Sequence, residues 1–151
     1  MEKKLSLTDS LSWIKKGKIL IHPTESIWGI GCDAFNEETV KQIYELKKRP
    51  KEKSLILLSP SLEITQKYIS KLNSEEEEYV NNLWPGHVTV LFKYNKNLPD
   101  HLKNKSGKIA IRVSNHLPIN KLLTRFNGLL VSTSANLSGQ ETENDTNILL
   151  K

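Results

Sequence analysis

Three short segments of the chain gather hydroxyl, basic and small residues that could bind an anionic ligand. The first runs from His22 to Gly31 and carries Thr24, Glu25 and Ser26 directly after an apolar run. Hydroxyl groups can hold a polar ligand, and glycine lets the backbone approach it closely. The same residues would also suit a simple turn in which the hydroxyls cap backbone groups, and the pattern does not separate these two interpretations.

The second segment is strongly basic. Residues 47–53 contain four lysines and one arginine, just past the end of an expected helix. Basic groups stabilise the negative end of a helix dipole, but this density exceeds what that role requires. Arg49 can donate two parallel hydrogen bonds to a carboxylate or phosphate, and the lysines add point charge. The segment therefore favours an anion site.

The third segment, residues 132–139, reads Ser-Thr-Ser-Ala-Asn-Leu-Ser-Gly and follows an apolar run. We expect it to be a loop, and successive backbone N–H groups in such a loop can form a concave anion-binding site. It lacks the Gly-Lys-Ser/Thr sequence of a phosphate-binding P-loop. Taken alone, it does not specify a ligand.

Signatures of metal and covalent catalysis are absent from the sequence. The four histidines show no metal-ligand spacing, and no Gly-x-Ser-x-Gly turn occurs. The sole cysteine, Cys32, excludes a disulfide within this sequence and a four-cysteine zinc site. We expect Cys32 to be a buried, small apolar residue.

Alternating strands and helices must position the three segments. Apolar runs predict strands over residues 18–21, 55–58, 87–92, 108–113 and 128–131, with Pro23 ending the first. Apolar periodicity predicts a first helix with Leu7, Leu11 and Ile14 on one face, and a second that follows Asn36 and is stopped by Pro50. It also predicts helices over residues 62–69, 74–83 and 117–126. The pattern predicts an α/β fold: a single domain with a twisted mixed β-sheet flanked by helices. In such sheets ligands bind at the ends of strands.

Capping residues refine the expected helix starts. The first helix should be capped near Thr8 or Asp9, and the second by Asn36. The fourth should begin with a capping box formed by Ser74 and Glu77. We place Leu46 on the apolar face of the second helix.

Composition sets the broad class. The chain has 151 residues, of which 37% are hydrophobic and 26% charged, as expected for one soluble globular domain. No apolar run approaches the ~18 residues of a membrane span, and no apolar core of a signal peptide follows the basic start. We therefore expect a cytoplasmic protein without a membrane partner. The net charge of +5 suits nucleotides or nucleic acid, but a lysine-rich codon bias would produce it too.

The motifs together resemble those of a known family. His22-Pro-Thr-Glu-Ser-Ile-Trp-Gly-Ile-Gly31 is similar to its Tyr-Pro-Thr-Glu-Thr-x-Tyr-Gly-Leu-Gly motif, and residues 47–50 match its Lys-x-Arg-Pro. Trp84-Pro85-Gly86 with Thr89, the strand around Arg112, and residues 134–139 match three further motifs in order and spacing. Over residues 8–139 the chain therefore resembles the YrdC-like threonylcarbamoyl-AMP synthases (TsaC).

This resemblance implies an enzyme, a nucleotidyltransferase that makes threonylcarbamoyl-AMP and pyrophosphate from L-threonine, bicarbonate and ATP. Mg²⁺ would accompany ATP as part of the substrate, without a dedicated protein cage or any tightly bound cofactor. A partner transferase would then move the threonylcarbamoyl group to an adenosine of tRNA. Because no covalent enzyme intermediate is needed, catalysis would come from positioning and charge neutralisation.

The resemblance also implies roles for individual residues. Those implied to hold L-threonine are Ser26, Arg112 and Ser132, with the guanidinium of Arg112 on the carboxylate. Those implied to face ATP are Arg49, Lys53, Lys108, Ser134 and Thr142. Lys47, Arg49 and Arg112 would be catalytic, and Asn136 would shape its loop or touch the ligand. The sequence departs from the family pattern at His22 (usually Tyr), Ser26 (usually Thr) and Lys53 (often Asn).

Length and charge each leave one other hypothesis open. Family members usually continue for some tens of residues past the Ser-Ala-Asn segment, so residues 1–151 would be one YrdC-like domain without the C-terminal part of the family's domain. One alternative is an inactive, truncated paralogue. The other is a non-catalytic module whose basic surface, including the lysines of residues 93–108, binds tRNA or double-stranded RNA through phosphates. That module would not explain hydroxyl residues at strand ends, so the enzyme is favoured.

Overall fold

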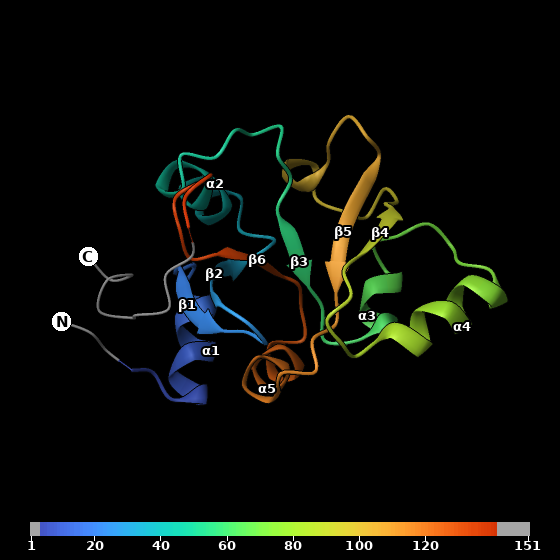
Figure 1. Ribbon diagram of the computed structural model, residues 1–151, viewed down its shortest axis with the longest axis horizontal. Coiled ribbons are helices and arrows are strands. Elements are labelled where there is room, and N and C mark those ends of the chain that lie inside the picture. The colour runs from blue at the N-terminus through green and yellow to red at the C-terminus, as the bar shows by residue number, and fades with distance from the viewer. Residues whose placement is uncertain (1–3, 142–151) are drawn as a thin grey trace.

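The chain folds around one six-stranded mixed sheet, seen in a computed structural model that describes residues 4–141 (Figure 1). The strands are β1 (Leu20–Pro23), β2 (Trp28–Asp33), β3 (Ile56–Leu58), β4 (Val90–Lys93), β5 (Lys108–Arg112) and β6 (Leu130–Ser134). The helices are α1 (Leu7–Lys15), α2 (Glu37–Leu46), α3 (Leu62–Gln66), α4 (Ser74–Leu83) and α5 (Leu117–Phe126), with a 3₁₀ turn over Asp100–Leu102. The strand order is β1-β2-β6-β3-β5-β4, in which β3 and β5 are parallel and the other pairs antiparallel. The predicted fold class is confirmed.

One face of the sheet is fully covered. Alternate side chains of the central strands point into a core with α2, α3 and α4, because successive residues of a strand face opposite sides. From the sheet this core contains Leu57, Ile109, Ile111 and Val131, all buried. Figure 1 shows α3 and α4 toward the β4 end of the sheet and α2 toward the β2 end.

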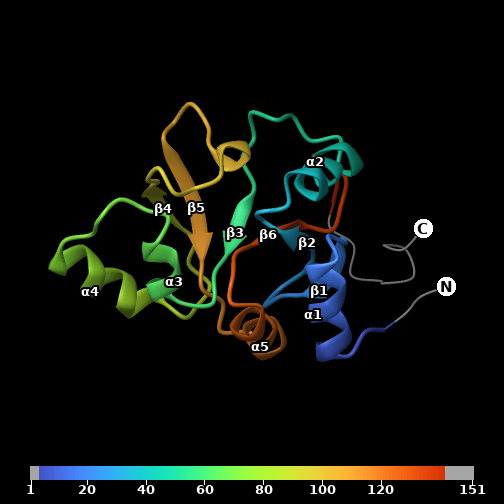
Figure 2. The same cartoon turned by 180° about the vertical axis from the view of Figure 1, so that it is seen from behind.

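The opposite face is covered only in part. Helices α1 and α5 lie together in both views and pack over Leu58 and Leu130 (Figure 2). Farther along the same face, Ser132 pairs with Ile56, and Leu91 pairs with Ala110. The Leu91 side chain is 62% exposed, although it lies on a sheet. We call this uncovered part of the face, which holds Ser132, Ser134, Ala110 and Leu91, the open face.

Two helix caps differ from the expectations. The N-cap of α1 is Ser6, whose hydroxyl accepts from the backbone N–H of Asp9, rather than Thr8 or Asp9 itself. The capping box of α4 is formed by Asn73 and Glu76, one residue before the predicted pair of Ser74 and Glu77. An N-cap residue must have an extended backbone, and Asn73 has one, whereas Ser74 is already helical.

Helix ends also differ. Asn36 caps α2 as predicted, but Leu46 is its last residue and is 56% exposed, so it does not lie on the apolar face. Helix α3 ends at Gln66 instead of continuing to residue 69. Ile69 pairs with Tyr94 as an isolated bridge, so its backbone extends the sheet rather than the helix.

The largest correction concerns the strands. The sequence predicts a turn over residues 22–31 and a loop from Ser132, but β2 occupies Trp28–Asp33 and β6 extends through Ser134. Pro23 is the last residue of the edge strand β1 and so ends it as predicted. Glycine in β2 serves close packing here: a Cβ on Gly29 would lie 2.7 Å from Cε1 of His22. The first and third segments therefore meet as neighbouring strands, β2 and β6, paired from Gly29 with Ser134 to Asp33 with Leu130.

Candidate active site on the open face of the sheet

Lys47 joins the second segment to the third. It is the C-cap residue of α2 and is 3% exposed. Its Nζ donates to the carbonyl oxygens of Ser134 (2.5 Å) and Asn136 (2.7 Å) and to Oδ1 of Asn136 (3.2 Å). In return, its own carbonyl accepts from the N–H of Ser138 at 3.0 Å. All three N–H donors of the ammonium therefore contact the Ser-Ala-Asn segment.

The charge of Lys47 is held at an energetic cost. Burial and the nearby charge of Arg49 lower the pKa of Lys47 to about 8. The three oxygens that surround Nζ compensate for the lost water, and the group remains mostly protonated at neutral pH. Lys47 thus fixes the loop that presents Ser134.

Arg49 shapes the basic turn that follows α2. Its Nε donates to the carbonyl of Lys53 at 2.9 Å and its Nη2 to the carbonyl of Ser54 at 3.0 Å. Lys48, with φ 49°, reverses the chain just before it. Among residues 4–141, none accepts from Nη1 of Arg49, so this end of the guanidinium is available to an anion. The adjacent Lys53 is exposed.

Two hydroxyls of the third segment, those of Ser132 and Ser134, are already engaged within the protein. The hydroxyl of Ser134 donates to Oδ1 of Asn136. Ser132 is buried, and its Oγ lies 3.4 Å from Nε2 of His22. The backbone N–H of Ala135 donates to the carbonyl of Trp28 at 2.9 Å, which ties this segment to the first.

Ser26 differs because it is exposed at the turn between β1 and β2. Thr24 holds that turn: its hydroxyl donates to the carbonyl of Ile27 at 2.5 Å. The interpretation of a turn capped by a hydroxyl therefore holds for Thr24, while the Ser26 side chain stays free for a ligand.

Arg112 carries the least satisfied polar group of the site. It ends β5, and its Nη1 donates to the carbonyl of His87 at a long 3.5 Å. Its Nε is buried, and within the described chain no atom accepts from it. A buried N–H without an acceptor costs free energy, so such groups usually mark a missing ligand or water.

An ionised carboxylate lies near Arg112. Burial by itself would raise the pKa of Glu25, but hydrogen bonds from Ser114 and from the backbone, with the charges of Arg112 and His87, hold this pKa below its usual value. A cation with a free N–H and a carboxylate in its field offer complementary charges for a zwitterionic amino acid. Neither Glu25 nor Ser114 was assigned a role from the sequence, and only their contact across 89 positions reveals one.

The remaining predicted residues lie apart from this pair. Lys108 begins β5 on the same face as Arg112 and is exposed. Four residue steps along a strand separate them by about 13 Å, so a ligand that reaches both must be extended. Thr142 lies outside the described residues.

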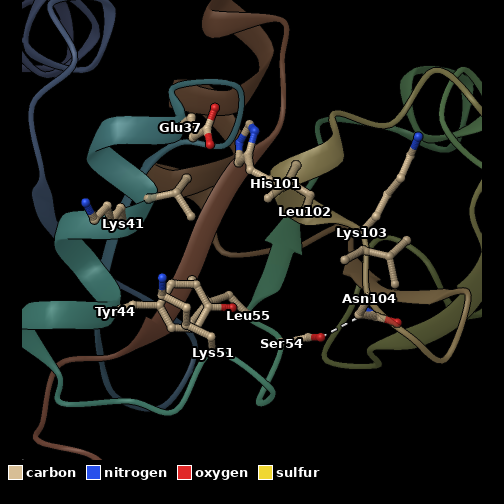
Figure 3. A pocket seen from close by; sticks show the side chains of 12 residues that line it. Glu37, Lys41, Tyr44, Lys51, Ser54, Leu55, His101, Leu102, Lys103 and Asn104 are labelled. Atoms are coloured by element: carbon tan, nitrogen blue, oxygen red, sulfur yellow. Dashed lines mark hydrogen bonds between the residues drawn. The ribbon is translucent and has the colours of Figure 1, made fainter.

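A pocket of about 260 Å³ lies on the covered face between α2, β3 and the segment before β5 (Figure 3). Tyr44, Leu55 and His101 help to line it, and a hydrogen bond from Asn104 to Ser54 closes one side. None of the residues predicted to bind substrate lines it. The candidate site is therefore the open face rather than this pocket.

Metal-binding clusters and membrane-spanning helices are both missing from the described part of the chain. Within residues 4–141, no group of three or more His, Cys, Asp or Glu side chains is arranged to hold a metal ion. In the same part of the chain, every helix is too short or too polar to cross a membrane.

Comparison with known proteins identifies the family. The Sua5/YciO/YrdC family model, described as "Telomere recombination", matches residues 12–150. The chain belongs to this family, which confirms the resemblance inferred from the motifs.

Curated relatives carry one functional name. A threonylcarbamoyl-AMP synthase of Acinetobacter baumannii is 35% identical over 142 residues, which cover 90% of this chain and 75% of the relative. One of Klebsiella pneumoniae is 37% identical over 137 residues, covering 89% of this chain and 72% of the relative.

Solved structures share the fold. Sua5 of P. abyssi complexed with L-threonine superposes with a TM-score of 0.85 at 25% identity, covering 97% of this chain but 44% of that protein. The chain thus spans less than half of the Sua5 polypeptide. E. coli YciO has a TM-score of 0.84 at 24% identity, with 95% of this chain and 70% of that one covered, and it supports the fold alone.

Proposed function

We propose that this chain is a threonylcarbamoyl-AMP synthase. It would convert L-threonine, bicarbonate and ATP into threonylcarbamoyl-AMP, pyrophosphate and water. The relatives of that name support the proposal. Within the structure, the observation that carries it is the buried Nε–H of Arg112 on the open face, for which residues 4–141 supply no acceptor.

Arg112 would bind the carboxylate of threonine. A carboxylate supplies the acceptor that Nε lacks, and a second oxygen can accept from a neighbouring guanidinium N–H. The charge of Arg112 is one of the influences that lower the pKa of Glu25, so this carboxylate lies near the guanidinium. Being negative, it would attract the amino end of the same ligand. Ser26, from the turn between β1 and β2, and Ser132, from β6, would contact threonine as well.

ATP would occupy the part of the open face that leads away from Arg112. Lys108 lies on that face, and Arg49 and Lys53 would add positive charge from the turn after α2, where no described residue accepts from Nη1 of Arg49. Ser134 is held at the same face by Lys47 and Asn136. Mg²⁺ would arrive with the nucleotide as part of the substrate, and Thr142 would contact the nucleotide from beyond the described residues.

The chemistry needs no nucleophile from the protein. The amine of threonine attacks the carbon of CO₂ formed from bicarbonate, loses a proton, and becomes an N-carboxylate. A carboxylate oxygen then attacks the α-phosphorus of ATP, and the bond from that phosphorus to the β-phosphate oxygen breaks to release pyrophosphate. Holding two anions together is the main obstacle, so the cations of the open face would act by charge neutralisation and alignment.

Downstream partners follow from the product. A mixed anhydride of AMP and a carbamate is a reactive acyl donor, and a transferase that accepts it and modifies tRNA would be the partner. RNA itself is a further candidate partner, because Lys93, Lys96, Lys105 and Lys108 are exposed around the β4–β5 connection. RNA held there through phosphates would dissociate steeply with added salt, whereas salt-independent binding would count against this surface.

The test is pyrophosphate release from ATP with and without L-threonine and bicarbonate. We expect release only when both are present. Arg112→Ala should lower kcat/KM for threonine by about tenfold to a hundredfold, because charge-assisted hydrogen bonds to its carboxylate are lost. Arg125→Ala is the matched control, since Arg125 is exposed in the last turn of α5. Release that ignores threonine, or an unaffected Arg112→Ala variant, would reject the proposal.

A further inference from the structure

The one buried histidine beside the proposed threonine site controls the direction of a hydroxyl group. We propose that His22 is a positioning residue: its Nε2 accepts the hydroxyl proton of Ser132, so that the lone pairs of Oγ face the substrate. Ser132 then acts as a hydrogen-bond acceptor for the amino or hydroxyl group of threonine. The identity of this ligand rests on the proposed function, but the polarity of the hydroxyl does not.

The tautomer of His22 follows from its two contacts. Nδ1 lies 3.2 Å from the carbonyl oxygen of Pro23, which can only accept, so Nδ1 must carry the hydrogen. In a neutral ring Nε2 is then unprotonated and can only accept. Ser132 Oγ, 3.4 Å away, is its partner and therefore donates. In an imidazolium both ring nitrogens carry a hydrogen. Nε2 would then donate to Oγ, and Ser132 would have to turn its own hydrogen outward.

Burial keeps the ring neutral. His22 is 3% exposed, and burial lowers the pKa of His22 against the opposing contact with the carbonyl of Pro23. The charged and titratable groups that face it are His116 at the start of α5 and Arg112 at the end of β5, which also lower this pKa, and Glu25, which raises it.

The ring is also fixed in place. His22 and Gly29 are paired across β1 and β2, and a Cβ on Gly29 would lie 2.7 Å from Cε1 of the ring. A Cβ on Gly31, which is paired with Ser132, would clash with the carbonyl oxygen of Val131 and would lie 3.3 Å from Nε2. The ring therefore occupies the space that a side chain at Gly29 would take, lies against Gly31, and reaches Ser132 across the intervening strand.

The first experiment reads the tautomer directly, in the full chain labelled with ¹⁵N. Long-range ¹H–¹⁵N spectra distinguish Nδ1–H, Nε2–H and the imidazolium, and a His22→Phe sample assigns the resonance among the four histidines. We expect Nδ1–H at neutral pH. Either Nε2–H or the imidazolium would overturn the proposal, whether or not the chain is an active synthase.

The second experiment measures threonine affinity by calorimetry from pH 8 down to pH 5, because burial lowers the pKa of His22 and the ring is protonated only at pH values below the ordinary pKa of histidine. His22→Phe removes the acceptor and should weaken binding about fivefold to tenfold, the value of one hydrogen bond. His22→Gln places an amide oxygen that can accept from Ser132 but does not titrate. It should restore affinity and abolish the loss of binding that the native chain shows toward acid pH.

The Ser132→Ala background separates positioning from general damage. There the substitution of His22 by Phe should have no further effect on affinity, because His22 acts through Ser132. An equal loss in both backgrounds, or a Gln variant as weak as Phe, would overturn the proposal. A native chain that binds no threonine would reject the proposed function, while the tautomer would still decide the polarity of Ser132.

Discussion

The ammonium group of Lys47 donates to both the backbone carbonyl and the side-chain oxygen of Asn136, at 2.7 and 3.2 Å. With its third bond, to Ser134, it connects the end of α2 to the end of β6. Two motifs that stand far apart in the sequence thus form one structural unit. The basic segment contributes to the site by holding the serine-rich segment as well as by its charge.

The buried charge of Lys47 predicts a pH-dependent difference in stability. Its folded-state pKa of about 8 lies below the ordinary value of 10.5. Between these pH values the unfolded chain binds more protons, so this group makes the free energy of unfolding rise with pH. Lys47→Met does not titrate and lacks that contribution. Between pH 8 and 10.5 the free energy of unfolding of the native chain should therefore rise by roughly 2–3 kcal/mol relative to that of the variant. Urea unfolding of both proteins measures this difference. A constant or falling difference would contradict this.

The thiol of Cys32 should be inert in the folded protein. Burial, with a smaller contribution from the charge of Asp33, raises the pKa of Cys32 to about 12. The thiolate is the reactive form, so Ellman's reagent at pH 8 should label the native chain only as fast as it unfolds. In denaturant, one thiol per chain should react at once. Rapid stoichiometric labelling without denaturant would disprove the burial of this side chain.

The position of the capping box in α4 can be tested with neighbouring substitutions. Asn73→Ala removes the acceptor for the N–H of Glu76 and should lower the free energy of unfolding by about 1 kcal/mol. Ser74→Ala changes the first helical residue and should leave stability within about 0.5 kcal/mol of the native value. Urea unfolding of both variants decides the point, and the reverse order of effects would restore the cap expected from sequence.

The packing of α5 on the partly covered face predicts a larger effect. Leu123 is fully buried against α1 and the sheet, and Leu123→Ala should cost about 2–5 kcal/mol. Leu117 lies on the same helix but is 62% exposed, so Leu117→Ala should cost little. Thermal unfolding compares the two directly. Similar losses for both would mean that α5 does not pack as described.

Local patterns in the sequence predict much of this fold. The bounds of α5, the Asn36 cap and the buried strand over β3 all follow from apolar periodicity and helix signals. Strand β2 was missed because its glycines are typical of turns, and only the neighbouring strands explain them: the ring of His22 leaves no room for a Cβ at Gly29, and the carbonyl of Val131 leaves none at Gly31. The extension of β6 was missed because Ser132 to Ser134 are polar, yet pairing with β2 keeps them extended.

The candidate site could also be predicted from the sequence only in part. The types and order of its residues are readable from the sequence, because hydroxyls and cations are the groups that an anionic substrate requires. Their contacts are not, since the bonds from Lys47 to Asn136 and from Ser114 to Glu25 join residues that are 89 positions apart. Such partners are set by strand order, which no local pattern encodes.

The measurement that tests the central claim most directly is detection of the product. The chain is incubated with L-threonine, ATP, Mg²⁺ and ¹³C-bicarbonate, and nucleotides are analysed by mass spectrometry. We predict threonylcarbamoyl-AMP that carries the ¹³C label, dependent on threonine and strongly reduced in Arg112→Ala but not in Arg125→Ala. A folded chain that releases AMP without labelled product, or that yields no nucleotide product at all, would contradict the account.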